Sequence, residues 1–147
     1  MLRSDEIRKR QHGVPPEQRL PNSAYGEAAS EAVLGELTAL VTETAMGGHA
    51  VIADATFIDP RDRSRLAAAA RAVAVPFLGL WLQAPLAELE TRIAERNHDA
   101  SDATIAVLHA VSRGNPGPGD WTAVEAIEPT QTEAQARLAI RSARSDC

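Results

Sequence analysis

The sequence has 147 residues, enough for one domain with a core and too few for two, and its hydrophobic content includes few aromatic side chains, which favours helices with a modest sheet. Its net charge of −5 argues against binding to duplex DNA, because such surfaces neutralise phosphates with an excess of basic residues. No apolar run reaches membrane-spanning length, the N-terminus is charged from Arg3 onward, and the only cysteine, Cys147, excludes an intrachain disulfide, so we expect a soluble cytoplasmic protein without a membrane partner.

The N-terminal third predicts two helices separated by a loop. Ser4 is a good N-cap for a helix over residues 5–11, in which acidic residues precede basic ones, as the helix dipole prefers. The stretch GVPPEQRLPNS at 13–23 contains three prolines and a glycine and predicts a loop. Apolar residues at helical spacing then predict a long helix that starts at residue 22 or 23 and ends at Gly47–Gly48.

Strands and helices alternate along the middle of the chain. Short apolar runs at 49–57 (HAVIADATF) and 75–82 (VPFLGLWL) predict strands that are buried on both faces. Each run is followed by a predicted helix, over 60–73 and over 84–97. This order favours a parallel sheet with right-handed helical crossovers.

The C-terminal part predicts one more strand and a closing helix. NPGPGDW at 115–121 is a loop because of its prolines and glycines, and TAVEAIEP at 122–129 predicts a short strand. A helix is predicted over 130–144. Together the elements predict an α/β fold with a small parallel sheet flanked by helices.

Two carboxylates follow predicted strands, where the active sites of open parallel sheets lie. Asp5 follows the first apolar residues, and Asp54 closes the run AVIAD, with Thr56 two residues later. A carboxylate beside a hydroxyl can hold a hydrated Mg²⁺, which makes Asp54 a candidate metal ligand. Asp54 could equally be a turn residue or a helix cap, and Asp5 could form a solvated salt bridge with Arg8.

A pair of arginines forms a third candidate group. Arg92 and Arg96 lie four residues apart, so a helix would place both on one face, where they could grip a polyphosphate. The alternative is an exposed helix on which the arginines form surface pairs with Glu88 and Glu95.

The stretch DASDA at 99–103 supplies Asp99 or Ser101 as an N-cap for the next helix. The histidines show no metal-ligand spacing and are interpreted as loop or surface residues. They are His12, His49, His98 and His109.

Five stretches in order resemble the P-loop kinase domains of the AAA-family ATPase group, which are related to polynucleotide kinases, gluconate kinases and zeta toxins. The stretches are LRSDEIRKR, GGHAVIADATF, VPFLGLWLQAP, LETRIAERNHDASDA and GDW. The resemblance implies that the γ-phosphoryl group of ATP is transferred to a hydroxyl-bearing acceptor, with ATP and Mg²⁺ as cofactors. It does not name the acceptor, since a fold analogy assigns no substrate.

The resemblance also implies roles for the acids that follow the strands. In the S-D-x-x-R element, Asp5 is similar in role to a general base for the acceptor hydroxyl, and Ser4 and Arg8 would contact the acceptor. The D-x-T element, with Asp54 and Thr56, would lie near the acceptor and the metal. These roles suit phosphoryl transfer, which depends mostly on positioning and charge neutralisation.

The arginines resemble those of a kinase lid. Arg92 and Arg96 would meet the phosphates during transfer, from a helical lid over about 86–113. The resemblance therefore implies a P-loop NTPase-like three-layer fold, with residues 1–147 as a single domain.

One element of that family is missing from the sequence. No GxxxxGK[ST] loop, the Walker A motif that binds phosphates, occurs anywhere, and the single lysine, Lys9, follows the S-D-x-x-R element's arginine, Arg8. We therefore expect an incomplete, truncated domain that lacks its first strand, phosphate loop and first helix.

Three explanations of this absence stay open. The sequence could be a fragment or have a misplaced start, so that the complete protein is an ordinary kinase. It could be a degenerate pseudokinase that serves as a binding or interaction module. Finally, a partner chain or a second copy could supply the missing strand at an exposed sheet edge. In each case the chain alone is expected to be inactive.

Overall fold

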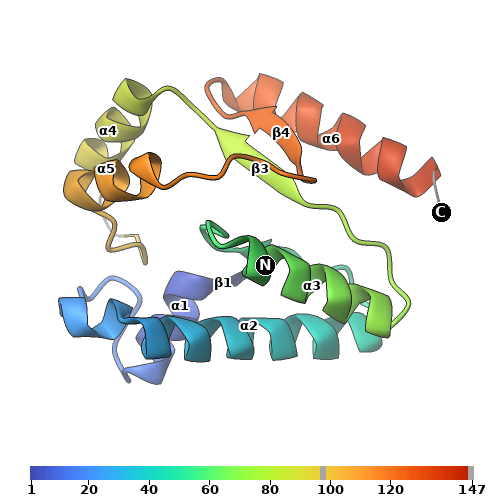
Figure 1. Cartoon of the computed structure of the whole chain (residues 1–147), viewed down its shortest axis with the longest axis horizontal. Coiled ribbons are helices and arrows are strands. Elements are labelled where there is room, and N and C mark those ends of the chain that lie inside the picture. Colours follow the sequence, from blue (N-terminus) through green and yellow to red (C-terminus); the bar gives the residue numbers. More distant parts are fainter. Residues whose placement is uncertain (97–98, 146–147) are drawn as a thin grey trace.

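The computed structural model describes residues 1–96 and 99–145 and has an α/β fold (Figure 1). The sequence interpretations of His98 and Cys147 lie outside the described residues. In chain order the elements are β1 (Leu2–Arg3), α1 (Ser4–Gln11), the 3₁₀ helix η1 (Asn22–Tyr25), α2 (Glu27–Met46), β2 (Ala53–Asp54), α3 (Pro60–Ala72), β3 (Leu80–Gln83), α4 (Leu86–Glu95), α5 (Ile105–Arg113), β4 (Thr122–Glu125) and α6 (Pro129–Ser145).

The strands pair in parallel, as predicted, but they form two sheets of two strands instead of one. β1 pairs with β2, which places Arg3 opposite Asp54. β3 pairs with β4, which places Leu80 opposite Thr122. In Figure 1, α2 and α3 lie on the side of the first sheet, while α6 lies along the second. The predicted α/β fold with parallel strands is therefore confirmed, but its small sheet is divided into two pairs of strands.

β2 is much shorter than the strand predicted at 49–57, and it is not buried on both faces. Ile52, directly before it, is 65% exposed. The extended run ends soon after β2 because Phe57 has a φ of 44°, in the left-handed region that non-glycine residues rarely adopt. The second predicted strand shortens to β3, within which Trp81 is buried.

The hydrophobic core lies where α1, α2 and α3 pack around the first sheet. Val33 and Leu37 are four residues apart and therefore share one face of α2. Their burial removes apolar surface from water, the main favourable contribution to folding. The buried residues of this cluster are Ile7, Val33, Leu37, Phe57 and Leu66.

Arg63 of α3 links the two sheets. Its Nε donates to the carbonyl oxygen of Phe57 at 2.7 Å, and its Nη1 donates to those of Gly117 and Pro118 at 2.8 and 2.9 Å. The guanidinium also stacks over the ring of Trp81 in β3, 4.3 Å from its centre. One buried side chain thus fixes the second sheet against the helix that follows the first.

Two N-terminal helix starts differ from the predictions. Ser4 is the first residue of α1 and not its N-cap, because Arg3 is held in extended backbone by β1 and takes the capping position. The long helix starts at Glu27, because Gly26 has an extended backbone that separates α2 from the 3₁₀ turn η1.

The predicted lid segment contains the two helices α4 and α5, which pack against each other. His109 lies in α5 and not in a loop, and its side chain is 42% exposed, as predicted for a surface residue; its Nε2 lies 2.7 Å from Glu90 Oε1 of α4. Thr104 caps α5, with its Oγ1 accepting from the backbone N–H of Val107 at 3.3 Å. The predicted caps at 99 and 101 are therefore wrong. Among the residues that the structure describes, no helix is long and apolar enough to cross a membrane.

Candidate functional site

The carboxyl ends of β1 and β2 meet and bring charged side chains together. Arg3 Nε donates to Asp54 Oδ2 at 3.1 Å, and Arg3 Nη2 donates to Asp99 Oδ1 at 2.9 Å. Arg96 Nε lies 3.5 Å from the other oxygen of Asp99. Arg3 therefore joins the first sheet to the segment that follows α4, at the place where parallel sheets carry their sites.

Asp5 lies half-buried beside this ion-pair group, in the first turn of α1. Burial raises the pKa of Asp5, while a hydrogen bond with Ser101 and the positive charges of Arg3 and Arg8 oppose the rise. The negative charge of Asp54 adds to the rise. The two acids are thus close enough for the charge of Asp54 to influence Asp5.

Arg8 is buried and holds the chain around η1. Its Nη1 donates to the carbonyl oxygen of Ala24 at 2.7 Å, and its Nη2 lies 3.4 Å from Ser30 Oγ. The guanidinium stacks over Tyr25, 4.7 Å from the ring centre. The alternative of a solvated Asp5–Arg8 pair is therefore wrong. Arg8 Nε is buried without a hydrogen-bond partner in the described part of the chain.

Lys9, next along α1, is also buried. Its Nζ lies 2.8 Å from both carboxylate oxygens of Asp102 and also donates to the carbonyl oxygen of Gln18. Asp102 Oδ2 in addition accepts from Tyr25 Oη at 2.5 Å and from the backbone N–H of Leu20 at 2.9 Å. Although burial alone would raise it, the hydrogen bonds from Lys9 and Tyr25 bring the pKa of Asp102 below its ordinary value.

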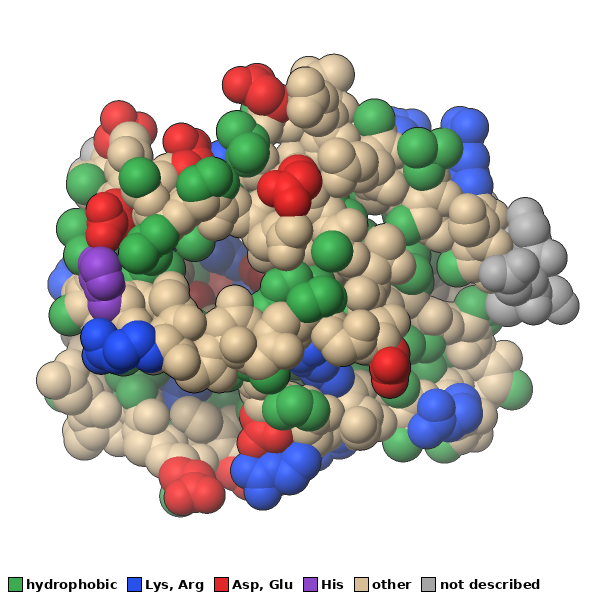
Figure 2. Space-filling model, turned by 45° about the horizontal axis from the view of Figure 1, so that its top comes forward, with side chains coloured by type: hydrophobic (Ala, Val, Ile, Leu, Met, Phe, Trp, Pro, Cys, Tyr) green, Lys and Arg blue, Asp and Glu red, His purple; other side chains and the backbone are tan. Residues whose placement is uncertain are grey.

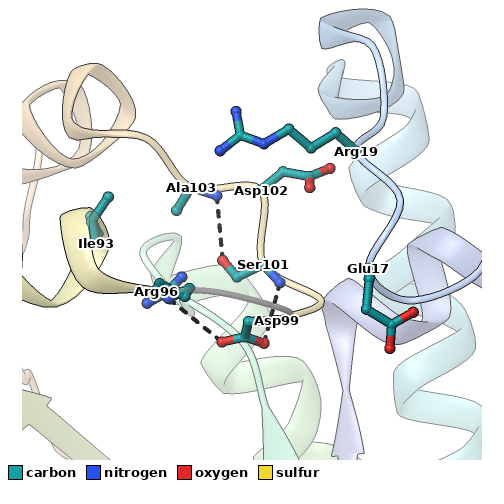
Figure 3. Close-up of a pocket in the computed structure, with 8 residues that line it drawn as sticks. All are labelled: Glu17, Arg19, Ile93, Arg96, Asp99, Ser101, Asp102 and Ala103. Carbon is teal, nitrogen blue, oxygen red and sulfur yellow. Dashed lines mark hydrogen bonds and ion pairs between the residues drawn. The ribbon is translucent and has the colours of Figure 1, made fainter.

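A polar pocket of about 110 Å³ lies between the loop after α1 and the segment after α4 (Figure 3). Glu17 and Arg19 line one side, and Ser101 lines the other. Ser101 also interacts with Asp5, so the pocket adjoins the strand ends. The remaining lining residues are Ile93, Arg96, Asp99, Asp102 and Ala103.

The two candidate lid arginines have different partners. α4 ends at Glu95, and Arg96 has an extended backbone, so the two arginines do not share a helical face as predicted. Arg92 Nε pairs with Glu88 at 2.9 Å, one of the surface pairs that the alternative interpretation named, and its Nη2 donates to the carbonyl oxygen of Ile127. Both arginines nevertheless line a second cavity of about 340 Å³ between β3 and helices α4 and α5.

Ser4 and Thr56 lie shortly after the ends of β1 and β2. Ser4 is half-buried and Thr56 is exposed. Within residues 1–96 and 99–145, the structure gives neither hydroxyl a hydrogen-bond partner. Their suggested contacts with an acceptor thus stay predictions.

The residues present do not fit the phosphates of ATP or a dedicated Mg²⁺ site. The sequence contains no GxxxxGK[ST] loop, and its single lysine is buried on Asp102. Asp54 already binds Arg3, whose positive charge disfavours a cation there. No group of three or more His, Cys, Asp or Glu in the described part of the chain could hold a metal ion.

A model of an AAA domain family matches residues 1–115, which include every element from β1 to α5. The chain belongs to this AAA domain family. Its members are P-loop kinase-like domains, which agrees with the resemblance seen in the sequence. No curated protein and no solved structure matches the chain.

Several residues of this candidate site were not identified from the sequence as site residues. Arg3, Asp99 and Ser101 meet Asp5 and Asp54 only through the tertiary fold, and no local pattern distinguishes them from caps and surface charges. Lys9 could have been singled out from the sequence. It is the only lysine among 15 lysines and arginines, which is unusual.

Proposed function

We propose that this AAA domain supplies the acceptor side of an ATP-dependent phosphoryl transfer to a hydroxyl group, with Asp5 as general base. The environment of Asp5 supports the proposal, because a half-buried carboxyl with a raised pKa stands at the joined ends of two parallel strands. A general base works best when its pKa approaches the operating pH, and burial moves Asp5 in that direction.

The polar pocket between Glu17, Arg19 and Ser101 is the proposed acceptor site, since it adjoins Asp5. An acceptor hydroxyl placed there would give its proton to the Asp5 carboxylate as its oxygen attacks the γ-phosphorus of ATP and ADP leaves. Arg8 would act by holding η1 in place, because its guanidinium is committed to Ala24 and Ser30. Arg96, half-exposed beside Asp99, is the proposed contact to the transferred group.

Binding of the nucleotide phosphates is proposed to come from residues outside this sequence. An upstream segment or a strand from a partner chain, including a second copy, could supply a phosphate loop. In the described part of the chain each sheet has two strands, which supports this idea because a further strand could pair at a sheet edge.

A second candidate function is a non-catalytic interaction module. It is favoured by the internal pairing of Lys9 with Asp102 and of Arg92 with Glu88, which leaves these cations little charge to offer phosphates. Light scattering after size-exclusion chromatography tests whether a second copy of the chain supplies the missing strand. A stable dimer supports a second copy as strand donor, whereas a monomer contradicts it.

The first test is a thermal-shift titration of the 147-residue chain with ATP and Mg²⁺. We expect no saturable shift below about 1 mM ATP, since a ligand stabilises a protein by RT ln(1 + [L]/Kd). A chain extended by a strand, a GxxxxGK[ST] loop and a helix should show the shift and transfer phosphate. A saturable shift with the unextended chain would contradict the assignment of phosphate binding to other residues.

The second test is Asp5→Asn in the extended chain. It should reduce transfer by roughly 100-fold or more while leaving ATP binding nearly unchanged, because a base acts on the acceptor. Asp120→Asn is the matched control, since Asp120 is exposed. Equal losses of transfer and of ATP binding in Asp5→Asn would contradict the role of Asp5.

A further inference from the structure

The buried ion pair between Lys9 and Asp102 is not explained by the proposed chemistry. The Lys9 side chain is 1% exposed, and burying an ammonium group is costly unless it is paired and hydrogen-bonded. Its three donors meet this condition, because they reach the two oxygens of Asp102 and the carbonyl oxygen of Gln18. A fully paired buried lysine therefore ties α1 to a residue 93 positions away in the sequence.

Asp102 collects donors from three separate segments. Besides Lys9 of α1, the backbone N–H of Leu20 in the loop and the hydroxyl of Tyr25 in η1 donate to it. The carboxylate thus joins α1, the loop and η1 to the 99–103 segment, which connects α4 to α5. Both the loop and this segment line the polar pocket (Figure 3).

The 99–103 segment also carries the groups that surround Asp5. Ser101, which hydrogen-bonds with Asp5, directly precedes Asp102, and Asp99 binds Arg3. Fixing Asp102 therefore fixes its neighbour Ser101 by chain connectivity. We propose that Lys9 and Asp102 are positioning residues, whose ion pair holds the 99–103 segment against α1 and keeps Ser101 at Asp5. The effect of this ion pair on phosphoryl transfer rests on the proposed function, whereas its effect on the 99–103 segment does not.

Lysine reactivity tests the contact itself. Lys9 is the single lysine, so acylation by an amine-reactive ester, followed by peptide mass spectrometry, reports its exposure without other side-chain amines. Asp102→Asn should increase the rate of Lys9 acylation by on the order of tenfold, because the segment opens more often. Asp120→Asn should leave the rate unchanged.

The pKa of Asp5, measured by NMR titration, tests the positioning role. The charged groups that face Asp5 are Arg3, Arg8 and Asp54, and all three remain in the variant. If Asp102→Asn releases the segment, Asp5 loses the hydrogen bond with Ser101, which lowers its pKa, and part of its burial, the larger effect, which raises it, so its pKa shifts from the wild-type value. Faster acylation of Lys9 with an unchanged Asp5 titration would overturn the proposal, since the pair would then be structural only. Unchanged acylation would overturn it as well.

A charge-neutral double variant guards against unfolding, because Asp102→Asn alone leaves a buried ammonium without its carboxylate. Lys9→Met combined with Asp102→Asn removes both charges and should fold. Its Asp5 pKa should shift as in the single variant, and an unchanged value would overturn the proposal. None of these measurements needs ATP or transfer, so a failure of the proposed function leaves their outcome unaffected.

Discussion

Gly79 lies directly against the indole ring of Trp121, and a Cβ built on it would overlap the ring carbons. The indole cannot move away easily, because it packs edge-to-face against Phe57 at 5.2 Å and Phe77 at 6.1 Å between ring centres. This contact lies where the chain enters β3 and β4. The absence of a side chain at Gly79 therefore allows β3 and β4 to pair beside Trp121.

We predict that Gly79→Ala destabilises the protein by about 1–3 kcal/mol, because overpacking forces the ring or the backbone to shift. Urea unfolding followed by Trp fluorescence measures the change.

Gly35→Ala is the matched control for this substitution. Gly35 is an exposed position within α2, and its added Cβ would meet nothing within 4 Å. Alanine should stabilise α2 by up to about 1 kcal/mol, because it loses less backbone entropy than glycine. Similar losses at both positions would show that the indole contact is not what excludes a side chain at Gly79.

The helix α2 owes its place to one apolar face. Leu37 is 1% exposed and packs with Val33 and Ile7 in the core, whereas the opposite face of the helix is in water. Its local signals are weaker, since no side chain caps its N-terminus. Tertiary packing therefore stabilises this helix more than its ends do.

Leu37→Ala is expected to cost about 2–5 kcal/mol, since it removes buried methyl groups and leaves a cavity. Chemical denaturation gives the free energy of unfolding. Leu138→Ala in α6 is the control, because Leu138 is 63% exposed and should lose little. A loss at Leu138 as large as at Leu37 would place the main core elsewhere.

The helices could be predicted from the sequence more closely than the strands. For α3, Asp59 accepts from the backbone N–H of Arg61 and Pro60 occupies the first turn, so the start is encoded locally. By contrast, β2 has two residues, and its length depends on how much of β1 lies beside it. An apolar run such as 49–57 does not contain that information.

The molecule as a whole should lose stability in acid. The pKa of Asp102 and that of Asp99 lie below their ordinary values, because donors such as Lys9 and Arg3 outweigh the raising effect of burial. The unfolded chain then binds more protons as the pH falls, which favours unfolding. The raised pKa values of Asp5 and Asp62 act in the opposite sense, but Glu36 and Asp59 join Asp99 and Asp102 in having lowered pKa values.

We predict that the thermal midpoint falls as the pH is lowered from about 6 to about 2, with the loss beginning near the ordinary carboxyl pKa. Circular dichroism melts at several pH values measure it. Asp102→Asn should show a smaller acid loss, since its share is removed, and Asp120→Asn should behave as the wild type. An equal acid dependence in Asp102→Asn would contradict the contribution of this pair.

The α/β class, the parallel pairing, most of the helices and the positions of Asp5 and Asp54 at strand ends could be predicted from the sequence, because periodicity, turn residues and motif spacing are local. The division of the strands into two sheets, the burial of Arg8 and the contact between Lys9 and Asp102 became evident only from the fold. Those outcomes depend on contacts between residues far apart in the chain, where burial and charge pairing outweigh local preference.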